Sequence, residues 1–188
     1  MMKTEIDKTL QVLKTGGVIL YPTDTIWGLG CDATNEQAVA RINEIKGRSS
    51  EKSLIILLDT DAKLPSYVTE IPDVAYDLIA YAENPLTIIF SGAKNLAPNV
   101  INADGSIGIR IVKHSFCEQL IQRFRKPITS TSANLSGSAS PRFFDEISEE
   151  IREAVDYVVD WEQKLRDEKK PSTIMKLAAG GQFSFIRR

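Results

Sequence analysis

The chain has 188 residues, of which 43% are hydrophobic and 26% charged, and 23 basic against 25 acidic side chains give a net charge of −2. These proportions are those of a globular protein and exclude a disordered, collagenous or disulfide-rich chain. The longest aliphatic run, residues 54–58, is far shorter than the about 20 apolar residues that a membrane helix needs. The N-terminus also lacks the apolar stretch of a signal peptide. We therefore expect one domain over residues 1–188, located in the cytoplasm, with Cys31 and Cys117 reduced.

Hydrophobic periodicity predicts helices and strands that alternate along most of the chain. Helices are expected over 6–13, over 38–45 after an Asn35 cap, over 74–82 after Pro72, over 114–124 and over 147–154. Strands are expected over 18–21, 54–58, 86–90, 107–111, 127–130 and 155–159, followed by the closing strands TIMKL and FSFI. Alternation of this kind is typical of an α/β protein. The two closing strands, which have no helix between them, favour a mixed sheet over a purely parallel one.

The charge is unevenly distributed along the chain. Residues 145–170 hold ten acidic and five basic side chains, so the remainder carries a small positive excess. A net negative charge argues against a protein whose main role is to grip a nucleic-acid backbone. A mildly basic body can still present one anion-binding face.

The first of four polar stretches beside expected strands is YPTDTIWGLG (21–30). Ligand crevices of α/β proteins form at such places. Thr23, Asp24 and Thr25 offer hydroxyl and carboxylate groups, and the glycines permit a close approach of the backbone. An alternative is a strand-ending turn in which the hydroxyls cap the backbone.

The second and third stretches carry cations. Lys46-Gly47-Arg48, with Lys52 behind it, either clamps a phosphate or carboxylate or simply complements the dipole of a helix C-terminus. Arg110 lies between isoleucines in IGIRI, where burial would require an anionic partner. The alternative for Arg110 is an edge strand with the side chain in water.

The fourth stretch, STSANLSG (130–137), continues to Ser138 and Ser140. Hydroxyls and an asparagine in such a loop suit binding of phosphate or ribose, although serine-rich loops can also be plain solvated turns. His114 is the one histidine and stands at an expected helix start, where a capping role is the simpler interpretation. The four stretches together offer cations and hydroxyls rather than acid–base pairs or metal ligands. Such a set suits electrostatic catalysis on a phosphate.

In their order and spacing, these stretches and the late Ser172-Thr173-Ile174 resemble the threonylcarbamoyl-AMP synthase family, whose fold is called YrdC-like. The resemblance runs from about Gly16 to Arg187. It implies a twisted mixed sheet flanked by helices, with a concave, positively charged cleft. It also implies a nucleotidyltransferase that joins L-threonine, bicarbonate or CO2, and ATP into threonylcarbamoyl-adenylate and pyrophosphate. A separate transferase complex would then modify an adenosine beside the tRNA anticodon.

The resemblance also assigns roles to individual residues. Lys46 and Arg48 would be catalytic and would neutralise the triphosphate, with Mg²⁺ delivered by ATP rather than held in a protein cage. The residues expected at threonine are Thr25, Arg110, Ser130 and Ser172. Those expected at ATP are Arg48, Lys52, Ser106, Ser132, Asn134, Ser140 and Arg187.

The chain departs from the family pattern at Leu57, where a histidine usually lies near threonine, and also at 52–53, 83–85 and Val112. If strand alternation sends Leu57 into the cleft, a histidine there should improve threonine binding. If Leu57 faces the core, the same substitution should destabilise the protein. Two other functions remain open: a double-stranded-RNA-binding protein using the concave face without catalysis, and an enzyme that makes carbamoyl-adenylate from carbamoyl phosphate.

Overall fold

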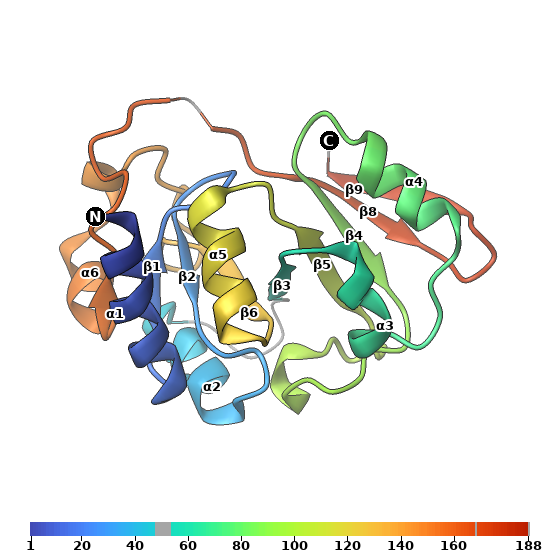
Figure 1. Ribbon diagram of the computed structural model, residues 1–188, viewed down its shortest axis with the longest axis horizontal. Coiled ribbons are helices and arrows are strands. Elements are labelled where there is room, and N and C mark those ends of the chain that lie inside the picture. Colours follow the sequence, from blue (N-terminus) through green and yellow to red (C-terminus); the bar gives the residue numbers. More distant parts are fainter. Residues whose placement is uncertain (48–53, 168, 188) are drawn as a thin grey trace.

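The computed structural model describes residues 1–47, 54–167 and 169–187 (Figure 1). The strands are β1 (Ile19–Tyr21), β2 (Gly28–Gly30), β3 (Ile55–Leu58), β4 (Leu86–Phe90), β5 (Ile107–Ile111), β6 (Ile128–Ser132), β7 (Tyr157–Val158), β8 (Thr173–Leu177) and β9 (Phe183–Arg187). The helices are α1 (Met2–Lys14), α2 (Glu36–Ile45), α3 (Leu64–Tyr67), α4 (Val74–Tyr81), α5 (Ser115–Phe124) and α6 (Glu149–Ala154). Short 3-10 turns cover Asp61–Lys63, Pro98–Val100 and Phe144–Glu146.

The described strands form one sheet in the order β7-β1-β2-β6-β3-β5-β4-β8-β9. The pairs β1–β7, β3–β5 and β4–β8 are parallel, and the other neighbouring pairs are antiparallel. The predicted α/β class and mixed sheet are therefore confirmed. The predicted Asn35 cap is also confirmed, since its side chain accepts a hydrogen bond from the Ala38 amide at 3.1 Å.

The sequence did not predict β2, which lies inside the first polar stretch. Its residues Gly28-Leu29-Gly30 have little intrinsic strand preference, because glycine lacks a side chain to pack. Yet β2 is enclosed between β1 and β6, and a Cβ at Gly30 would lie 2.6 Å from the Tyr21 ring and 2.7 Å from the Thr129 carbonyl. The close approach of neighbouring strands thus explains a glycine at this position.

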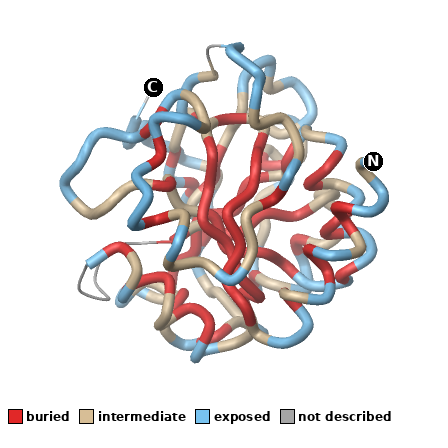
Figure 2. Tube along the Cα trace, turned by 90° about the vertical axis from the view of Figure 1, so that its left-hand side faces the viewer, coloured by how far each residue is buried: buried red, intermediate tan, exposed pale blue. Residues whose placement is uncertain are grey.

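Helices cover both halves of the sheet, and buried residues are concentrated in the central strands (Figures 1 and 2). In one core, apolar residues of α1 and α5 pack together with residues of β1, β3 and β6. In a second core, α2, α3 and α4 pack against β3, β4, β5 and β8. Residues of α6 complete a third, smaller cluster around Trp27 and Leu29. None of the described helices has the length and apolar character to span a bilayer.

Leu57 belongs to the core and not to a cleft. It is completely buried and packs in one cluster with Val112, Phe116 and Leu120, at the point where α5 contacts β3. Ile55 lies on the same face of the strand, two residues earlier, and is the residue that reaches the cavity described below. Of the two alternatives for Leu57, the core is confirmed and the cleft is excluded, because helix packing covers this face at position 57.

We predict that Leu57→His destabilises the protein. The change removes a packed aliphatic side chain and buries an imidazole in apolar surroundings, at a cost of about 2–5 kcal/mol in the free energy of unfolding. Thermal unfolding should show a Tm lower by about 5–15 °C for a chain of this length. The matched control is Leu165→His, because Leu165 is 46% exposed and an exposed substitution should cost within about 0.5 kcal/mol. Equal Tm values for the two variants would contradict the burial of Leu57.

Candidate functional site

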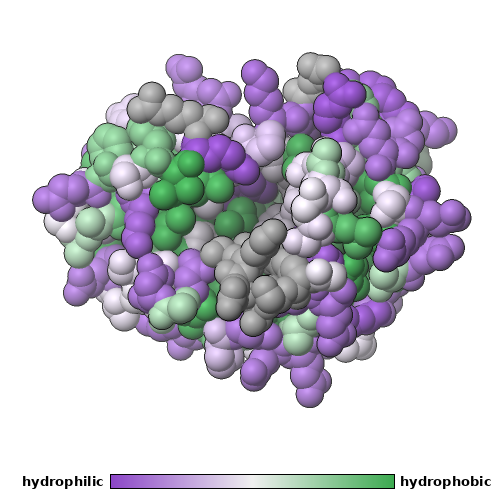
Figure 3. Space-filling view, turned by 180° about the vertical axis from the view of Figure 1, so that it is seen from behind, coloured by the Kyte–Doolittle hydropathy of each residue, from purple (hydrophilic) through white to green (hydrophobic). Residues whose placement is uncertain are grey.

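A cavity of about 190 Å³ lies where the centre of the sheet meets the C-terminal segment. Seen from behind, the molecule is visibly hollowed near its middle (Figure 3). The lining residues come from segments that are distant in sequence: Thr25, Ile26, Trp27, Gly28, Ile55, Arg110, Ser130, Thr131, Ser132, Ser140, Pro171, Ser172, Ile174 and Arg187. The sheet order explains this convergence, because β2, β6, β3 and β5 are consecutive neighbours.

All four residues expected at threonine line this one cavity. Thr25, Ser130 and Ser172 are buried hydroxyls, and Arg110 is a buried cation among them. The Ser172 hydroxyl is 2.8 Å from the hydroxyl of Thr87 on the neighbouring strand β4. The structure therefore brings the predicted set together, on β5, β6 and the segments next to β2 and β8.

In the first polar stretch, one threonine closes a turn and another lines the cavity, so each of the two interpretations of this stretch holds for one residue. The Thr23 hydroxyl donates to the Ile26 carbonyl at 2.8 Å and accepts from the Thr25 amide at 3.0 Å. Thr23 thus closes a local turn, as hydroxyl residues after a strand commonly do. That turn directs Thr25 into the cavity, with its hydroxyl 3.0 Å from that of Thr23.

The residues expected at ATP divide into three groups. Ser132, Ser140 and Arg187 line the cavity. Arg48 and Lys52 lie outside the described residues. Ser106 and Asn134 do not line the cavity; the Ser106 hydroxyl and the Asn134 side-chain amide nitrogen donate elsewhere, and the Asn134 Oδ1 is buried without a hydrogen-bond partner among the described residues.

Ser106 stabilises the turn that precedes β5. It is buried, donates to Asp104 at 2.5 Å and accepts from the Asn102 amide at 3.0 Å. Hydrogen bonds from Ser106 and Lys176 lower the pKa of Asp104 to about 2. Asn134 similarly donates to the carbonyls of its own loop, at Leu135 and Ser138.

Lys46 is the C-terminal cap of α2, and its side chain holds the loop that follows β6, residues 133–143, called the serine-rich loop below. Its side chain is nearly inaccessible at 3% exposure, and its ammonium donates to the carbonyls of Ser132 at 2.5 Å and Asn134 at 2.7 Å. The Lys46 carbonyl in turn accepts from the Ser136 amide at 2.9 Å. Lys46 is therefore buried and does not line the cavity, and its predicted catalytic role stays a prediction. Its charge is used to hold the loop that presents Ser132.

Arg110 is buried with an internal anionic partner. Its Nη2 lies 3.2 Å from Oδ1 of Asp24, and the side chains are only 4% and 6% exposed. The prediction that a buried arginine in IGIRI requires an anion is confirmed, and that anion is a carboxylate of the protein itself. The edge-strand alternative is excluded, because β5 pairs with β3 on one side and β4 on the other.

Arg187 reaches the cavity because of an irregularity in the β8–β9 pairing. Phe185 pairs with Met175, but Arg187 pairs with Ile174, so Ile186 is an extra residue in the register. Such a bulge redirects the side chains that follow it. Arg187 consequently faces the cavity with Ile174 and donates from Nε and Nη2 to the Ser172 carbonyl at 3.0 and 2.8 Å. Burial and the nearby charge of Arg110 lower the pKa of Arg187.

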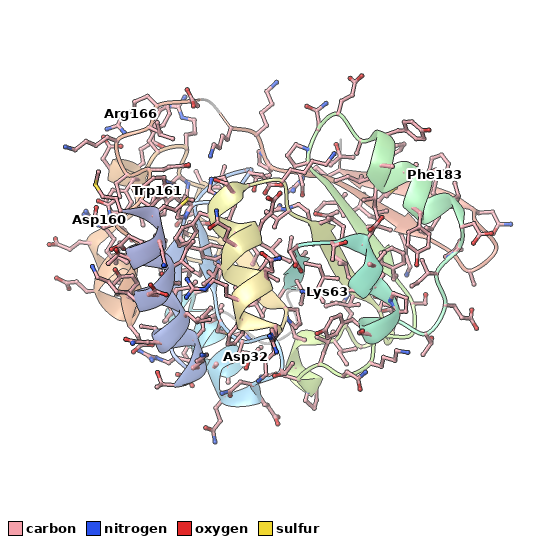
Figure 4. The ribbon with its side chains drawn as sticks, viewed as in Figure 1. Asp32, Lys63, Asp160, Trp161, Arg166 and Phe183 are labelled. Carbon is pink, nitrogen blue, oxygen red and sulfur yellow. The ribbon has the colours of Figure 1, made fainter. Side chains whose placement is uncertain are left out.

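The segment before β8 lies against the first polar stretch and carries Ser172 into the cavity. Lys169 donates to the Thr23 carbonyl at 2.8 Å, and Glu162 lies 3.0 Å from the Nε2 of His114. Burial opposes ionisation of Glu162, but hydrogen bonds and charges from His114 and Lys169 outweigh it and lower the pKa of Glu162. The expected cap by His114 is not formed, since its side chain makes no capping hydrogen bond to α5. Trp161 and Arg166 mark the course of this segment in Figure 4.

Sequence reasoning missed the apolar wall of the cavity. Ile55, Ile174 and Trp27 line it, and Trp27 is held by a tilted contact with Phe144 at 4.8 Å between ring centroids. Their pattern in the sequence is that of ordinary core residues. The one signal for this apolar wall in the sequence was Trp27, a large apolar side chain inside a polar motif.

The cavity can bind a small anionic ligand by hydroxyls and guanidinium groups beside an apolar surface. Among the described residues, no group of three or more metal-ligating side chains occurs. The prediction that Mg²⁺ is delivered with the nucleotide stays a prediction. The fold and the cavity define the class: an α/β protein with a small-ligand site built from hydroxyls and arginines at the centre of a mixed sheet.

The chain belongs to the Sua5/YciO/YrdC family, whose model, described as "Telomere recombination", matches residues 11–188. It is 36% identical over 184 residues to the threonylcarbamoyl-AMP synthase of Pseudoalteromonas translucida, covering 96% of this chain and 97% of that protein. It is 34% identical over 176 residues to the threonylcarbamoyl-AMP synthase of Hahella chejuensis, covering 93% and 95%.

Solved structures of the same family share the fold. P. abyssi Sua5 complexed with L-threonine superposes with a TM-score of 0.82 at 27% identity, over 92% of this chain and 50% of that one. This chain therefore spans about half the length of that protein. E. coli YciO superposes with a TM-score of 0.85 at 24% identity, over 100% of this chain and 90% of that one, and at that identity shows the fold alone.

We predict that Lys46→Met destabilises the serine-rich loop. The change keeps the length of the side chain but removes the ammonium donor from the Asn134 carbonyl and leaves the Ser132 carbonyl with the Asn134 amide alone. An unsatisfied buried group costs about 1–3 kcal/mol. The Tm should fall, and limited proteolysis should cleave the chain faster within residues 133–143. The control is Lys63→Met, because Lys63 forms a partly exposed pair with Asp59 at 2.6 Å that should contribute about 1 kcal/mol or less. If both variants unfold and are cleaved alike, Lys46 does not brace the loop.

Proposed function

We propose that this protein is an L-threonylcarbamoyladenylate synthase that acts in threonylcarbamoyladenosine modification of tRNA. The observation that carries the proposal is the convergence of Thr25, Arg110, Ser130 and Ser172 in one cavity. Relatives named threonylcarbamoyl-AMP synthase over nearly their whole length support it, and their name makes the protein an enzyme of the transferase type. The more specific nucleotidyltransferase activity is part of the proposal.

The cavity offers complementary groups for each part of L-threonine. Its carboxylate would bind the Arg110 guanidinium, since a planar fork of donors suits a carboxylate. Its hydroxyl would lie among the hydroxyls of Thr25, Ser130 and Ser172. Its methyl group would contact the apolar wall near Ile55. The structure of P. abyssi Sua5 complexed with L-threonine supports this choice of substrate.

The proposed chemistry needs positioning more than acid–base groups. The threonine nitrogen attacks CO2 and loses a proton, giving a carbamate, and a carbamate oxygen then attacks the α-phosphorus of ATP while pyrophosphate leaves. Holding reactants in the correct geometry can lower such a barrier by about 7–11 kcal/mol. Ser132, Ser140 and Arg187 would face the nucleotide. Mg²⁺ bound to ATP would add charge neutralisation, and no described residue is required to hold it.

The remaining partners are proposed on the same basis. A separate transferase complex would consume the adenylate, and any RNA affinity would be weak and strongly salt-dependent because only backbone charge would be sensed. The relatives favour the synthase over an RNA-binding protein or an enzyme acting on carbamoyl phosphate. A cytoplasmic location stays a prediction.

The direct test measures pyrophosphate release and the labile adenylate. We expect product only when ATP, Mg²⁺, L-threonine and bicarbonate are all present. Serine should be used about 10–200-fold less efficiently in kcat/KM, because one methyl group in an apolar pocket contributes about 1–3 kcal/mol of discrimination. Pyrophosphate release that does not depend on threonine, or equal turnover of serine, would contradict the proposed function or its proposed substrate, respectively.

A further inference from the structure

Asp24 and Arg110 form a buried ion pair at the boundary of two cavities. Arg110 lines the site described above, whereas Asp24 lines a second cavity of about 210 Å³ with Ile111, Lys113 and residues 82–86. Asp24 therefore contacts the arginine from behind and does not itself reach the proposed ligand. Any effect it has on that ligand must act through Arg110.

The pair leaves part of the guanidinium available to a ligand. Among the described residues, the contact of Arg110 with a carboxylate is the one at 3.2 Å to Asp24, made by Nη2. The Arg110 Nε is buried and has no hydrogen-bond partner. Buried polar groups are nearly always paired, so the unpaired donor shows that the protein does not satisfy this guanidinium fully. Because Nε itself is covered, an anion in the cavity would meet Arg110 through the part of the side chain that lines the cavity.

The loop that carries Asp24 holds its carboxylate in a fixed place. The second oxygen of Asp24, Oδ2, accepts from the Lys113 amide at 3.3 Å. Asp24 lies inside the turn that the Thr23 hydroxyl closes with the Ile26 carbonyl, and Lys169 donates to the Thr23 carbonyl at 2.8 Å. These contacts restrict the Asp24 carboxylate, which holds the guanidinium as an ion pair at 3.2 Å rather than by a hydrogen bond, because its Oδ1 has no hydrogen-bond partner among the described residues.

Asp24 also sets the charge of this end of the cavity. Arg110 and Arg187 both line it, close enough for the charge of one to lower the pKa of the other. Without a negative charge beside them, two guanidinium groups would attract polyphosphates strongly. Asp24 offsets one of the two positive charges.

We propose that Asp24 is a positioning residue for amino-acid binding, which orients Arg110 toward the cavity and makes that end selective for a monoanionic carboxylate over a polyphosphate. The inference rests on the proposed function, because it takes an amino acid to be the ligand at Arg110. It extends that function by naming the residue that separates the amino-acid end from the nucleotide end.

The test compares the binding of L-threonine and of inorganic pyrophosphate to Asp24→Asn and to the unaltered protein by calorimetry. The substitution keeps the shape of Asp24 and removes its charge. We expect the Kd for L-threonine to rise at least tenfold because Arg110 is no longer held. The affinity for pyrophosphate should stay unchanged or become tighter, because the positive charge of the cavity increases. A purely structural role would weaken the binding of both ligands.

The matched control is Asp32→Asn. Asp32 is also a buried carboxylate, 7% exposed, and forms an ion pair with Lys126 at 2.7 Å. It lines neither cavity and lies below α5 in the view of Figure 4. We expect this variant to lose thermal stability while its affinities for both ligands stay within about twofold.

The outcomes separate the inference from the proposed function. If the unaltered protein binds no L-threonine, the proposed function fails and the inference fails with it. If it binds L-threonine and Asp24→Asn binds it equally well, or if both ligands weaken in parallel, only the inference is overturned. Should Asp24→Asn not fold, Asp24→Glu retains the charge but displaces the carboxylate. That variant should weaken L-threonine several-fold without changing pyrophosphate binding, and unchanged L-threonine binding would again overturn the inference.

Discussion

The burial of Arg110 is the constraint on which the candidate site depends. A cation on an interior strand between β3 and β4 is costly unless an anion accompanies it. Asp24 supplies that anion, which requires the loop after β1 to lie against the end of β5. The same loop delivers Thr25 and Trp27 to the cavity. The electrostatic requirement of one side chain therefore fixes where the first polar stretch lies, and with it two walls of the site.

Cations in this protein have two different uses, which their positions in the sequence do not distinguish. The Lys46 ammonium donates to two backbone carbonyls where β6 meets the serine-rich loop, whereas Arg187 lines the cavity. The lysine ammonium has three N–H donors, so three carbonyls can pair all of them. A guanidinium has about five donors, more than a single contact can pair. This difference in donor number suits arginines to the lining of a cavity and a lysine to the support of a loop.

Most of the fold was predicted because the main helices bury one regular face, as α1 and α5 do, and the central strands are short apolar runs buried on both faces, as β5 is. The hydrophobic pattern missed β2, whose glycines are required by neighbouring strands that are distant in sequence. The motifs predicted that Thr25, Ser130 and Ser172 share a site. They could not show that Leu57 lies beneath α5, that Ser106 faces its own turn, or that Arg110 pairs with Asp24. Each of these depends on which segments meet in space, and no local pattern contains that information.

The bulge between β8 and β9 makes the C-terminal strand sensitive to its length in residues. Arg187 faces the cavity because Ile186 is the extra residue in the pairing. In a regular ladder, side chains alternate strictly between faces. Loss of Ile186 would remove the bulge and leave Arg187 opposite Ile174 in a regular ladder, whereas one residue inserted between Phe185 and Arg187 would stand opposite Ile174 in place of Arg187 if the bulge is kept. Insertions in the preceding turn at Gly180-Gly181 would leave Arg187 opposite Ile174. Homologues and engineered variants should therefore tolerate changes of length before the strand and resist insertions between Phe185 and Arg187.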